Sequence, residues 1–333
     1  MTFIKIFICF ILFLLMTNCS NVIKKITDDV KNANNDINNV MVKARETSIA
    51  LDNFIENLYI NKDKYDLSIE NMDVDKGGKY KFFNGRQYHK AVNDGGPTYI
   101  VTMDLKDYTD SKKTIRLLEN VESLIKDNSS DYFGQSVLCD NYVLQLYPWA
   151  DVISVAQPNL DIKKMFWFFM ADPQYDPDKK TIWLNEPFAQ LAYGSWVIDV
   201  LSPFYEGDTF RGVVNCSVYL TKVGRDKLSQ YSSMLLLTTQ NGKVISANTK
   251  AKNILKINIL NEVEHLEQMR ENKFIEEQFN LNYKVNHPDI VKFGEKLMNE
   301  NSFVIKIYNK NYFVYKKNIE ERPKLMVVGL IEK

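Results

Sequence analysis

The residue types that could carry chemistry are concentrated between Tyr147 and Leu220. Aromatic rings are dense in this stretch, and carboxylates and an amide stand among them. The rings are Tyr147, Trp149, Phe166, Trp167, Phe168, Trp183, Phe188, Trp196 and Tyr205, and the polar side chains are Asp151, Asp172, Asn185 and Asp199. Small-molecule sites are concave and mostly apolar, with a few polar groups that orient the ligand. Any one of these rings could be plain core packing, but the set predicts that some of them line a pocket.

The sequence lacks the patterns that mark catalytic and metal sites. The histidines are His89, His265 and His287, and none is at ligand spacing with another histidine or a cysteine. No nucleophile elbow, Walker loop or dinucleotide fingerprint occurs, and Gly95-Gly96 is too short to cradle a phosphate. Asp172 with Asp176 or Asp178 could bind a cation or act as acid and base, but their proline-rich setting, DPQYDPD, favours a surface loop. We expect no enzyme activity, no metal site and no cofactor.

Charge and length set further limits. The chain has 333 residues, and its 42 lysines and arginines balance its 42 aspartates and glutamates. This length suffices for two domains, each with its own core. Because neither sign dominates, nucleic acid is not an expected partner.

The first residues predict export. Lys5 is followed by an apolar run, Ile6 to Met16, whose roughly eleven residues of helix would span only about 17 Å of a bilayer core of about 30 Å. This fits a signal peptide better than a transmembrane helix. Cys19 follows at once, in a setting that resembles a bacterial lipoprotein signal, although Met16 and Asn18 stand where leucine and a small residue are usual. We expect Cys19 to be acylated; an uncleaved anchor and plain secretion are the alternatives.

No second apolar segment of spanning length follows Cys19, so we expect no route of the chain's own for signalling across a membrane. Two cysteines, Cys139 and Cys216, remain in predicted strands. An exported compartment permits a disulfide between them. The favoured interpretation is two buried free thiols that pack as small hydrophobes.

The elements that must position the pocket begin with a long helix. From Asn21 to about Ile60, apolar residues recur at helical spacing without a proline or glycine, which predicts one amphipathic spine. A coiled-coil dimer is the alternative, but the heptad is loose. A second amphipathic helix is predicted over Tyr108–Lys126, with Asp110 or Ser111 as its cap.

Strands and turns fill most of the remaining sequence. A hairpin is predicted at Asn84-Gly85, Asp140-Asn141 should turn between two strands, and Pro203 should lie in the connection between two others. The strands are predicted over 99–105, 136–138, 142–147, 196–201, 211–220, 234–239, 244–247, 302–308, 312–317 and 324–331, with a charged connector over 220–231 and a largely helical, irregular stretch over 251–300. Two α+β modules are therefore expected, each an antiparallel sheet flanked by helices.

An ordered set of motifs carries a resemblance to a known family. YPWAD, FWFFMADPQYDPDKKTIW, NEPF, WVIDVLSPFYEG and FRGVV follow one another between Tyr147 and Val214, and the order resembles the double Cache family of extracytoplasmic, PAS-like sensor domains. The N-terminal residues predict a signal peptide over 1–18, followed by a lipid-anchored cysteine and a long helix over 19–62. The resemblance implies that this helix is the spine of two modules, a membrane-distal module with the pocket over 63–222 and a membrane-proximal module over 223–333.

The resemblance also implies a ligand site in the membrane-distal module. In the amino-acid-binding branch an arginine grips the ligand carboxylate and an aspartate in the glycine-valine-valine strand holds the amine. Met165 and Ser217 stand at these two positions, and losing both charge-assisted bonds makes a free α-amino acid a poor ligand. Lys163 or Lys164 could supply a point charge in place of the arginine, but not its two-pronged geometry. The expected ligand-binding residues are Tyr147, Trp149, Asp151, Lys164, Met165, Trp167, Phe168, Trp183, Phe188 and Ser217.

The sequence therefore predicts an exported, lipid-anchored protein that binds a small metabolite outside the cytoplasmic membrane, at that membrane's outer face or at the outer membrane. Without an output domain, it would present its ligand to a receptor or transporter. The alternative is a surface or periplasmic structural protein that retains the fold but not the binding.

Overall fold

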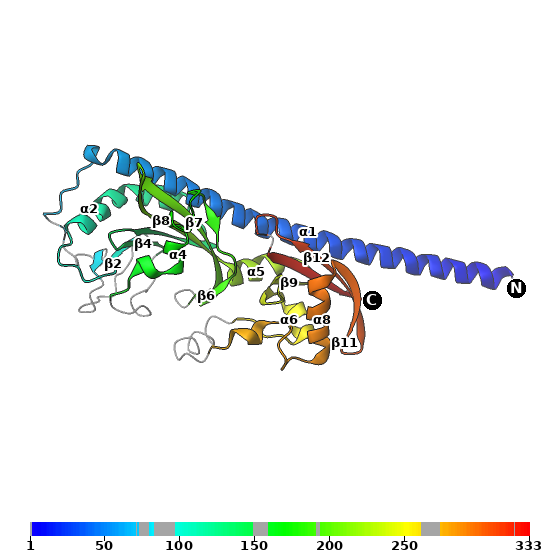
Figure 1. Ribbon diagram of the computed structural model, residues 1–333. Helices are drawn as coiled ribbons and strands as arrows, with labels where there is room; N and C mark the ends of the chain where they lie inside the picture. Colours follow the sequence, from blue (N-terminus) through cyan, green and yellow to red (C-terminus); the bar gives the residue numbers. More distant parts are fainter. Residues whose placement is uncertain are drawn as a thin grey trace. The chain divides into compact units, whose positions relative to one another are not determined.

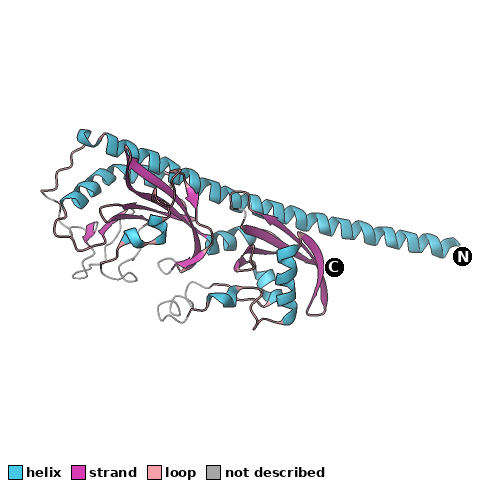
Figure 2. Ribbon diagram, viewed as in Figure 1, coloured by secondary structure: helices cyan, strands magenta, loops and turns pink. Residues whose placement is uncertain are grey.

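The computed structural model describes residues 2–70, 72, 80–82, 97–148, 159–190, 194–260, 274–322 and 324–333. The chain divides into two compact units, one formed by residues 41–219 and the other by residues 1–40 together with 220–333. Each unit contains a sheet with helices packed on it (Figures 1 and 2). This is the α+β class that the sequence predicts, and the fold prediction is confirmed.

One helix, α1 (Thr2–Ile60), supplies side chains to both cores. Its N-terminal part places Ile26, Val30 and Ile37 in the core of the unit formed by residues 1–40 and 220–333, and none of the three has exposed surface. Its C-terminal part places Leu51 and Ile55 in the core of the 41–219 unit, also fully buried. The predicted apolar stripe is therefore confirmed as the buried face of a single helix.

The 41–219 unit is built on an eight-stranded sheet, whose spatial order is β1-β2-β4-β3-β8-β7-β5, with β6 also paired to β7. All neighbours are antiparallel except β1 and β2. The strands are β1 (Tyr80–Phe82), β2 (Thr98–Val101), β3 (Phe133–Cys139), β4 (Val143–Tyr147), β5 (Ile182–Trp183), β6 (Phe188–Gln190), β7 (Ser195–Glu206) and β8 (Thr209–Tyr219). The short helical elements are η1 (Lys62–Lys64), α2 (Thr109–Leu118), η3 (Glu119–Val121), α3 (Glu122–Asp127), η5 (Ile162–Lys164) and α4 (Phe166–Phe169).

Side-chain alternation separates the two faces of this sheet. On the α1 face, Phe204 and Val214 pack with α1 and α2, and the Ser202 hydroxyl lies 2.8 Å from that of Ser48 on α1. On the other face, which we call the α4 face, Leu201 and Val213 pack against α4, Ile162 and Leu184 (Figure 1).

Glycine is required at position 212, where β8 packs closely against Leu138 of β3 and Phe204 of β7. Its φ is +155°, and an added Cβ would lie 2.0 Å from the backbone oxygen of Leu138 and 2.6 Å from the Phe204 ring. The first residue of the glycine-valine-valine motif therefore has a packing reason to be glycine.

The other unit contains a five-stranded antiparallel sheet in the order β10-β9-β13-β12-β11. Its elements are α5 (Leu220–Leu228), β9 (Met234–Thr239), β10 (Val244–Ala247), α6 (Thr249–Leu255), η6 (Glu276–Phe279), α8 (Pro288–Asn299), β11 (Ser302–Ile307), β12 (Lys310–Asn318) and β13 (Leu325–Glu332). Helices α6 and α8 pack on one face, where Leu255, Phe293 and Val328 share a core. On the other face, a Cβ added to Gly329 would lie 2.5 Å from Val30 of α1.

Three local predictions are wrong. The predicted connector over 220–231 contains helix α5, with Leu220, Val223 and Leu228 fully buried. Pro203 lies inside β7, opposite Val213, rather than between strands. The residue that caps α2 is Tyr108, and the Asp107 carboxylate accepts from the Thr109 N–H at 2.9 Å.

The turn at Asp140-Asn141 is confirmed between β3 and β4, whereas Asn84-Gly85 lies outside the described residues. The preferred interpretation of the cysteines is also confirmed. Cys139 and Cys216 are buried free thiols, and burial raises the pKa of both.

Candidate functional site

The aromatic residues of the predicted pocket fall into two groups. On the α4 face, the ring of Phe166 lies between those of Trp167 and Phe188, with centroid separations of 4.7 and 5.1 Å in edge-to-face geometry. All three rings are half-buried. Phe168 is instead a core residue, 4% exposed, with its ring 5.4 Å from that of Phe210. The structure thus brings Trp167 and Phe188 together through Phe166.

Two other predicted site residues lie on the α1 face. Tyr147 packs against the core cluster that includes α1 and α2. Trp183 pairs with Val200, whose side chain points to the same face as that of Ser202. Trp149 and Asp151 lie outside the described residues.

The predicted residues just before α4 lie at the surface or at the helix start. Met165 is the N-cap of α4 and is half-buried. The Lys164 ammonium lies 3.2 Å from the Asp161 carboxylate, with its side chain 84% exposed. The ammonium of Lys163 lies 4.5 Å from the centroid of the Tyr142 ring. Both lysines therefore already have partners where the sequence offered them as replacements for a carboxylate-binding arginine.

Ser217 of β8 stands directly opposite Asp199 of β7. Both residues point to the α4 face, as does Asn215, which is two residues from Ser217 along β8 and opposite Leu201. Ser217 is 7% exposed, Asp199 is 1% exposed and Asn215 is 6% exposed. We call them the β7–β8 polar cluster.

Asp199 is the chemically unusual member of this cluster. Burial raises the pKa of its carboxyl to about 7, and hydrogen bonds from Ser217 and Asn215 partly oppose that shift. The Asn215 amide donates to Oδ2 of Asp199 at 3.1 Å. Oδ1 of Asp199 and Oδ1 of Asn215 are buried and have no hydrogen-bond partner among the residues that the structure describes. A buried acceptor left unpaired costs about 1–3 kcal/mol, so such a group is expected to have a partner beyond the described residues.

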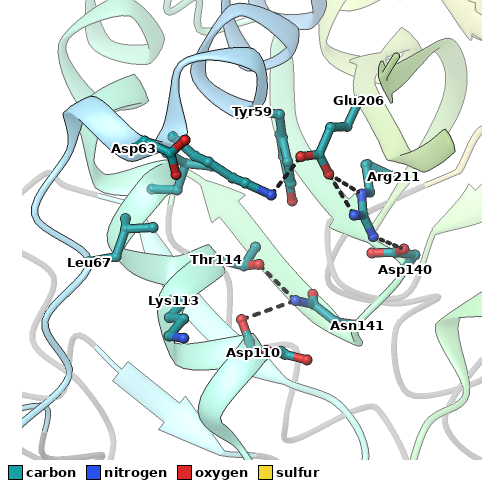
Figure 3. A pocket seen from close by; sticks show the side chains of 12 residues that line it. Tyr59, Asp63, Leu67, Asp110, Lys113, Thr114, Asp140, Asn141, Glu206 and Arg211 are labelled. Carbon is teal, nitrogen blue, oxygen red and sulfur yellow. Dashed lines mark hydrogen bonds and ion pairs between the residues drawn. The ribbon is translucent and has the colours of Figure 1, made fainter. Parts of the chain in front are cut away.

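A second feature of this unit is an open cleft on the α1 face, shown in Figure 3, with a volume of about 580 Å³. It is lined by Tyr59, Lys62, Asp63, Leu67, Asp110, Lys113, Thr114, Leu117, Asp140, Asn141, Glu206 and Arg211. These residues come from the end of α1, from η1 and the chain after it, from α2, from the β3–β4 turn and from the β7–β8 hairpin.

The strongest charges of the cleft are paired with one another. Glu206 accepts from Lys62 at 2.6 Å and from Nε and Nη2 of Arg211 at 2.9 and 2.5 Å. Nη1 of Arg211 lies 3.2 Å from Oδ2 of Asp140. The Asn141 amide spans to the Thr114 hydroxyl at 2.7 Å, which ties the β3–β4 turn to α2. The network shown in Figure 3 therefore has a structural use, because it joins η1 to the β7–β8 hairpin, that hairpin to the β3–β4 turn, and that turn to α2.

Other candidate groups are used locally. Asp172 accepts from the Gln174 N–H and Asp176 from the Lys180 N–H, so these carboxylates shape their own loop. His287 caps α8 by accepting from the Asp289 N–H, and His89 and His265 lie outside the described residues. Within the described ranges, no three histidine, cysteine or acidic side chains are grouped closely enough to hold a metal ion. In the same ranges, no helix has both the length and the apolar character needed to span a membrane.

The sequence did not single out the β7–β8 polar cluster. Asp199 was one of several polar side chains among the rings, and Ser217 was notable only as a departure from a family pattern. The register between two strands is what places them opposite each other. An aspartate in the middle of the apolar run WVIDVL was the available signal, because such a strand buries its side chains.

The long helix and the two sheet-and-helix units together define the fold of double Cache sensor domains, as the resemblance predicts. No family model matches the chain, and no curated protein is similar enough in sequence to match.

Solved structures show the likeness at the level of fold. The ligand-binding domain of the Campylobacter jejuni chemoreceptor Tlp3, in complex with L-norvaline, superposes with a TM-score of 0.53 at 10% identity, over 94% of this chain and 91% of that one. The sensory domain of Tlp3 without a named ligand superposes with a TM-score of 0.52 at 11% identity, over 95% of this chain and 94% of that one. The isoleucine-bound form of that domain gives a TM-score of 0.51 at 10% identity, over 94% of this chain and 93% of that one. The likeness to these domains is one of fold, and it extends over 94–95% of this chain.

Proposed function

We propose that this protein is an extracytoplasmic binding protein, not an enzyme, and that it holds a small organic ligand on the α4 face of the 41–219 unit. The observation that carries the proposal is the buried Asp199 carboxylate, which has one oxygen without a partner in the described part of the chain. The fold supports it, because the solved relatives in fold are ligand-binding sensor domains.

The physical argument compares the two polar features of the unit. In the cleft on the α1 face, Arg211 and Glu206 neutralise each other, so a ligand would have to compete with bonds already made. In the β7–β8 polar cluster, Asp199 has no cationic partner among the groups that set its pKa. A ligand that bonds to Asp199 would therefore gain an interaction without breaking one.

The half-buried rings of Phe166, Trp167 and Phe188 lie on the same face and could supply the apolar wall of the site. Ligand sites combine such a wall with a few polar groups. Of the predicted ligand-binding residues, Trp167, Phe188 and Ser217 thus share the α4 face, with Met165 at the start of α4 beside them.

Thermal unfolding in the presence of a metabolite library tests this function. We expect at least one compound to raise the Tm, since ligands that bind only the folded state stabilise it. The gain should be lost in Trp167→Ala and kept in Tyr175→Ala, because Tyr175 is an aromatic residue with an exposed side chain. A library that leaves the Tm unchanged throughout would support the structural role instead, which the mutual packing of Phe166, Trp167 and Phe188 also favours.

We further propose that Cys19 is acylated and anchors the exported chain to a membrane, from which it presents its ligand to a receptor or transporter. Cells grown with labelled palmitate should label the wild-type protein and Cys139→Ala, but not Cys19→Ala. Equal labelling of all three, or of none, would contradict the anchor.

A further inference from the structure

We propose that the open cleft on the α1 face is a second binding site, and that it takes a neutral polyhydroxylated ligand, a sugar or a polyol. This site is separate from the one proposed above. Tyr59, Leu67 and Leu117 of its lining pack in the core of the α1 face, whereas the site proposed above lies on the α4 face of the same sheet. Either site can therefore exist without the other.

The cleft has the size of a small-molecule site but not the usual lining. Its volume of about 580 Å³ falls within the range of about 300–1,000 Å³ that such sites occupy. Most such sites are lined by apolar side chains, whereas only Leu67 and Leu117 among the twelve lining residues have no polar group. The ligand that fits is one that forms hydrogen bonds over most of its surface.

The charges of the lining disfavour a charged ligand. Three cationic side chains stand among four carboxylates: Lys62, Lys113 and Arg211, with Asp63, Asp110, Asp140 and Glu206. The hydrogen bond from Lys62 lowers the pKa of Glu206, and Arg211 adds to this effect, so Glu206 remains ionised and paired. An anion or a cation would have to compete with these ion pairs and would meet side chains of its own sign. A neutral ligand avoids both costs.

The ion pairs leave hydrogen-bonding capacity that hydroxyl groups can use. Arg211 has five N–H donors, and its bonds to Glu206 and Asp140 use three of them. Lys62 has three donors, of which Glu206 takes one. The side chains of Lys62, Glu206 and Arg211 are all partly exposed. Because a hydroxyl both donates and accepts, it can bond to the cation and the carboxylate of one pair without separating them.

Tyr59 adds a neutral hydroxyl at the end of α1. Its side chain points towards Thr114 (Figure 3), yet the buried Tyr59 hydroxyl has no hydrogen-bond partner among the described residues. Burial raises the pKa of Tyr59 well above its usual range, so this hydroxyl stays protonated and able to donate. A ligand hydroxyl would supply the partner that it lacks. Because the Tyr59 ring itself is buried, it offers no open face on which a nucleobase or another aromatic ligand could stack.

Asn141 adds an acceptor whose orientation is known. Its amide group donates to the backbone oxygen of Asp110 at 3.2 Å and to the Thr114 hydroxyl at 2.7 Å. A carbonyl oxygen can only accept, so the group that faces Asp110 is the amide nitrogen. Oδ1 of Asn141 is then the buried atom without a partner in the described part of the chain. The cleft thus lacks partners for both a donor and an acceptor, and hydroxyl groups can bond to either.

Calorimetry on the full chain tests the ligand class with two matched series of compounds. One is glucose with its charged counterparts glucosamine and glucuronate, and the other is galactose with galactosamine and galacturonate. We expect the neutral sugar of at least one series to bind, and its two charged counterparts to bind at least about tenfold more weakly. A Kd above about 1 mM for both neutral sugars would overturn the inference, as would tighter binding of a charged counterpart.

Two substitutions in one segment locate the site. Leu67 and Ile69 are both half-buried and both pack against the core of the α1 face, but Ile69 is not part of the cleft lining. Leu67→Trp should fill part of the cleft and weaken sugar binding by about tenfold or more, because the added ring takes the volume of the ligand. Ile69→Trp should leave the affinity unchanged. A Tm close to that of the wild type shows that each variant is folded.

A second pair of variants lies at exposed or half-buried positions of α2 and tests the site without changing the core. Lys113→Met removes one donor from the cleft and should weaken sugar binding by about fivefold. Lys112→Met is its control, because Lys112 is the neighbouring residue and is not part of the cleft lining. Sugar binding that is unaffected by both Leu67→Trp and Lys113→Met would overturn the assignment to this cleft.

Trp167→Ala separates this inference from the proposed function, because Trp167 lies on the α4 face. We expect it to leave sugar binding unchanged. If Trp167→Ala abolishes sugar binding while Leu67→Trp does not, the sugar is a ligand of the α4 face, and this inference is wrong while the proposed function gains support. If the metabolite library yields no ligand that depends on Trp167, but a neutral sugar binds and is lost in Leu67→Trp, the proposed function fails and the second site stands.

Discussion

Arg211 and Glu206 close the β7–β8 hairpin with a two-donor ion pair, in which both Nε and Nη2 of Arg211 donate to Oε2 of Glu206. The remaining amino group of Arg211 reaches Asp140 in the β3–β4 turn, 3.2 Å away. Burial raises the pKa of Asp140, and the hydrogen bond and charge of Arg211 oppose that shift.

Arg211→Lys should therefore destabilise the 41–219 unit. Lysine keeps the charge but offers one point donor group where arginine offers a planar fork. We expect the free energy of unfolding in urea to fall by about 1–3 kcal/mol. Lys310→Gln is the control, since its ion pair with Glu332 is about half exposed and its loss should change stability less than Arg211→Lys does. Equal effects of the two substitutions would show that the fork has no special role.

Asp199 should make stability depend on pH. Its pKa is raised to about 7 from the ordinary 3.8, so the folded state binds more protons than the unfolded state between these values. The stabilisation that the protonated Asp199 carboxyl gives the folded state is fully present below about pH 4 and is lost as pH rises towards 7. Asp199→Asn should leave the free energy of unfolding nearly unchanged at about pH 4.5, near the start of this window, and raise it at about pH 8. Urea unfolding at both pH values measures this, and a variant less stable than the wild type at pH 8 would contradict it.

Asp52 should act in the same direction over a slightly wider range. It lies one turn before Glu56 on α1, and burial, followed by the Glu56 charge, raises its pKa to about 8. The stabilising effect of its proton should be lost as pH rises from about 4 to 8. Asp52→Asn should therefore flatten the fall in Tm over this range. Asp208→Asn is the control, because the Asp208 side chain is fully exposed, and it should leave the wild-type slope unchanged.

Gly329→Ala should destabilise the unit formed by residues 1–40 and 220–333. The new Cβ would lie 2.5 Å from Cγ2 of Val30 and 2.9 Å from Cγ1 of Ile26, both buried on α1. Overpacking of this kind costs about 1–3 kcal/mol. Val30→Ala removes the nearest clashing methyl, so the double variant should lose less stability than the sum of the two single variants. Strict additivity in denaturant unfolding would show that the close approach does not matter.

Periodic elements were the most predictable part of the fold. The stripe that includes Ile26, Val30 and Ile37 repeats at helical spacing, and the strands of both sheets alternate or run continuously apolar, so each follows from local pattern alone. Helix α5 was missed because its charged residues masked a short buried stripe of Leu220, Val223 and Leu228.

Pro203 was misplaced for a tertiary reason. Proline in a sequence favours a break, because it cannot donate to a strand ladder. Strand β5 pairs with β7 only at Val200 and Leu201, so in the described sheet one side of β7 has no strand partner at Pro203. Local sequence does not show where a neighbouring strand ends.

The site was less predictable than the fold, because its key relationship lies across a strand pair. Trp167 and Phe188 could be grouped from composition, but the partner of Ser217 is set by register, which depends on the whole β7–β8 hairpin and its irregularity between Phe204 and Tyr205. The sheet face of Tyr147 and Trp183 likewise depends on strand alternation that begins elsewhere in the chain.

The order of strands in the five-stranded sheet has a consequence for truncated chains. Strand β13 comes after all the other strands in the sequence, yet it lies at the middle of its sheet, between β9 and β12. A premature stop codon or a proteolytic cut between residues 319 and 324 would leave the 41–219 segment intact and remove β13, the strand that is hydrogen-bonded to both β9 and β12. Quality control during biogenesis would then meet a half-folded protein, in which β9 still pairs with β10 and β12 with β11, but the edge that each presented to β13 is open to aggregation.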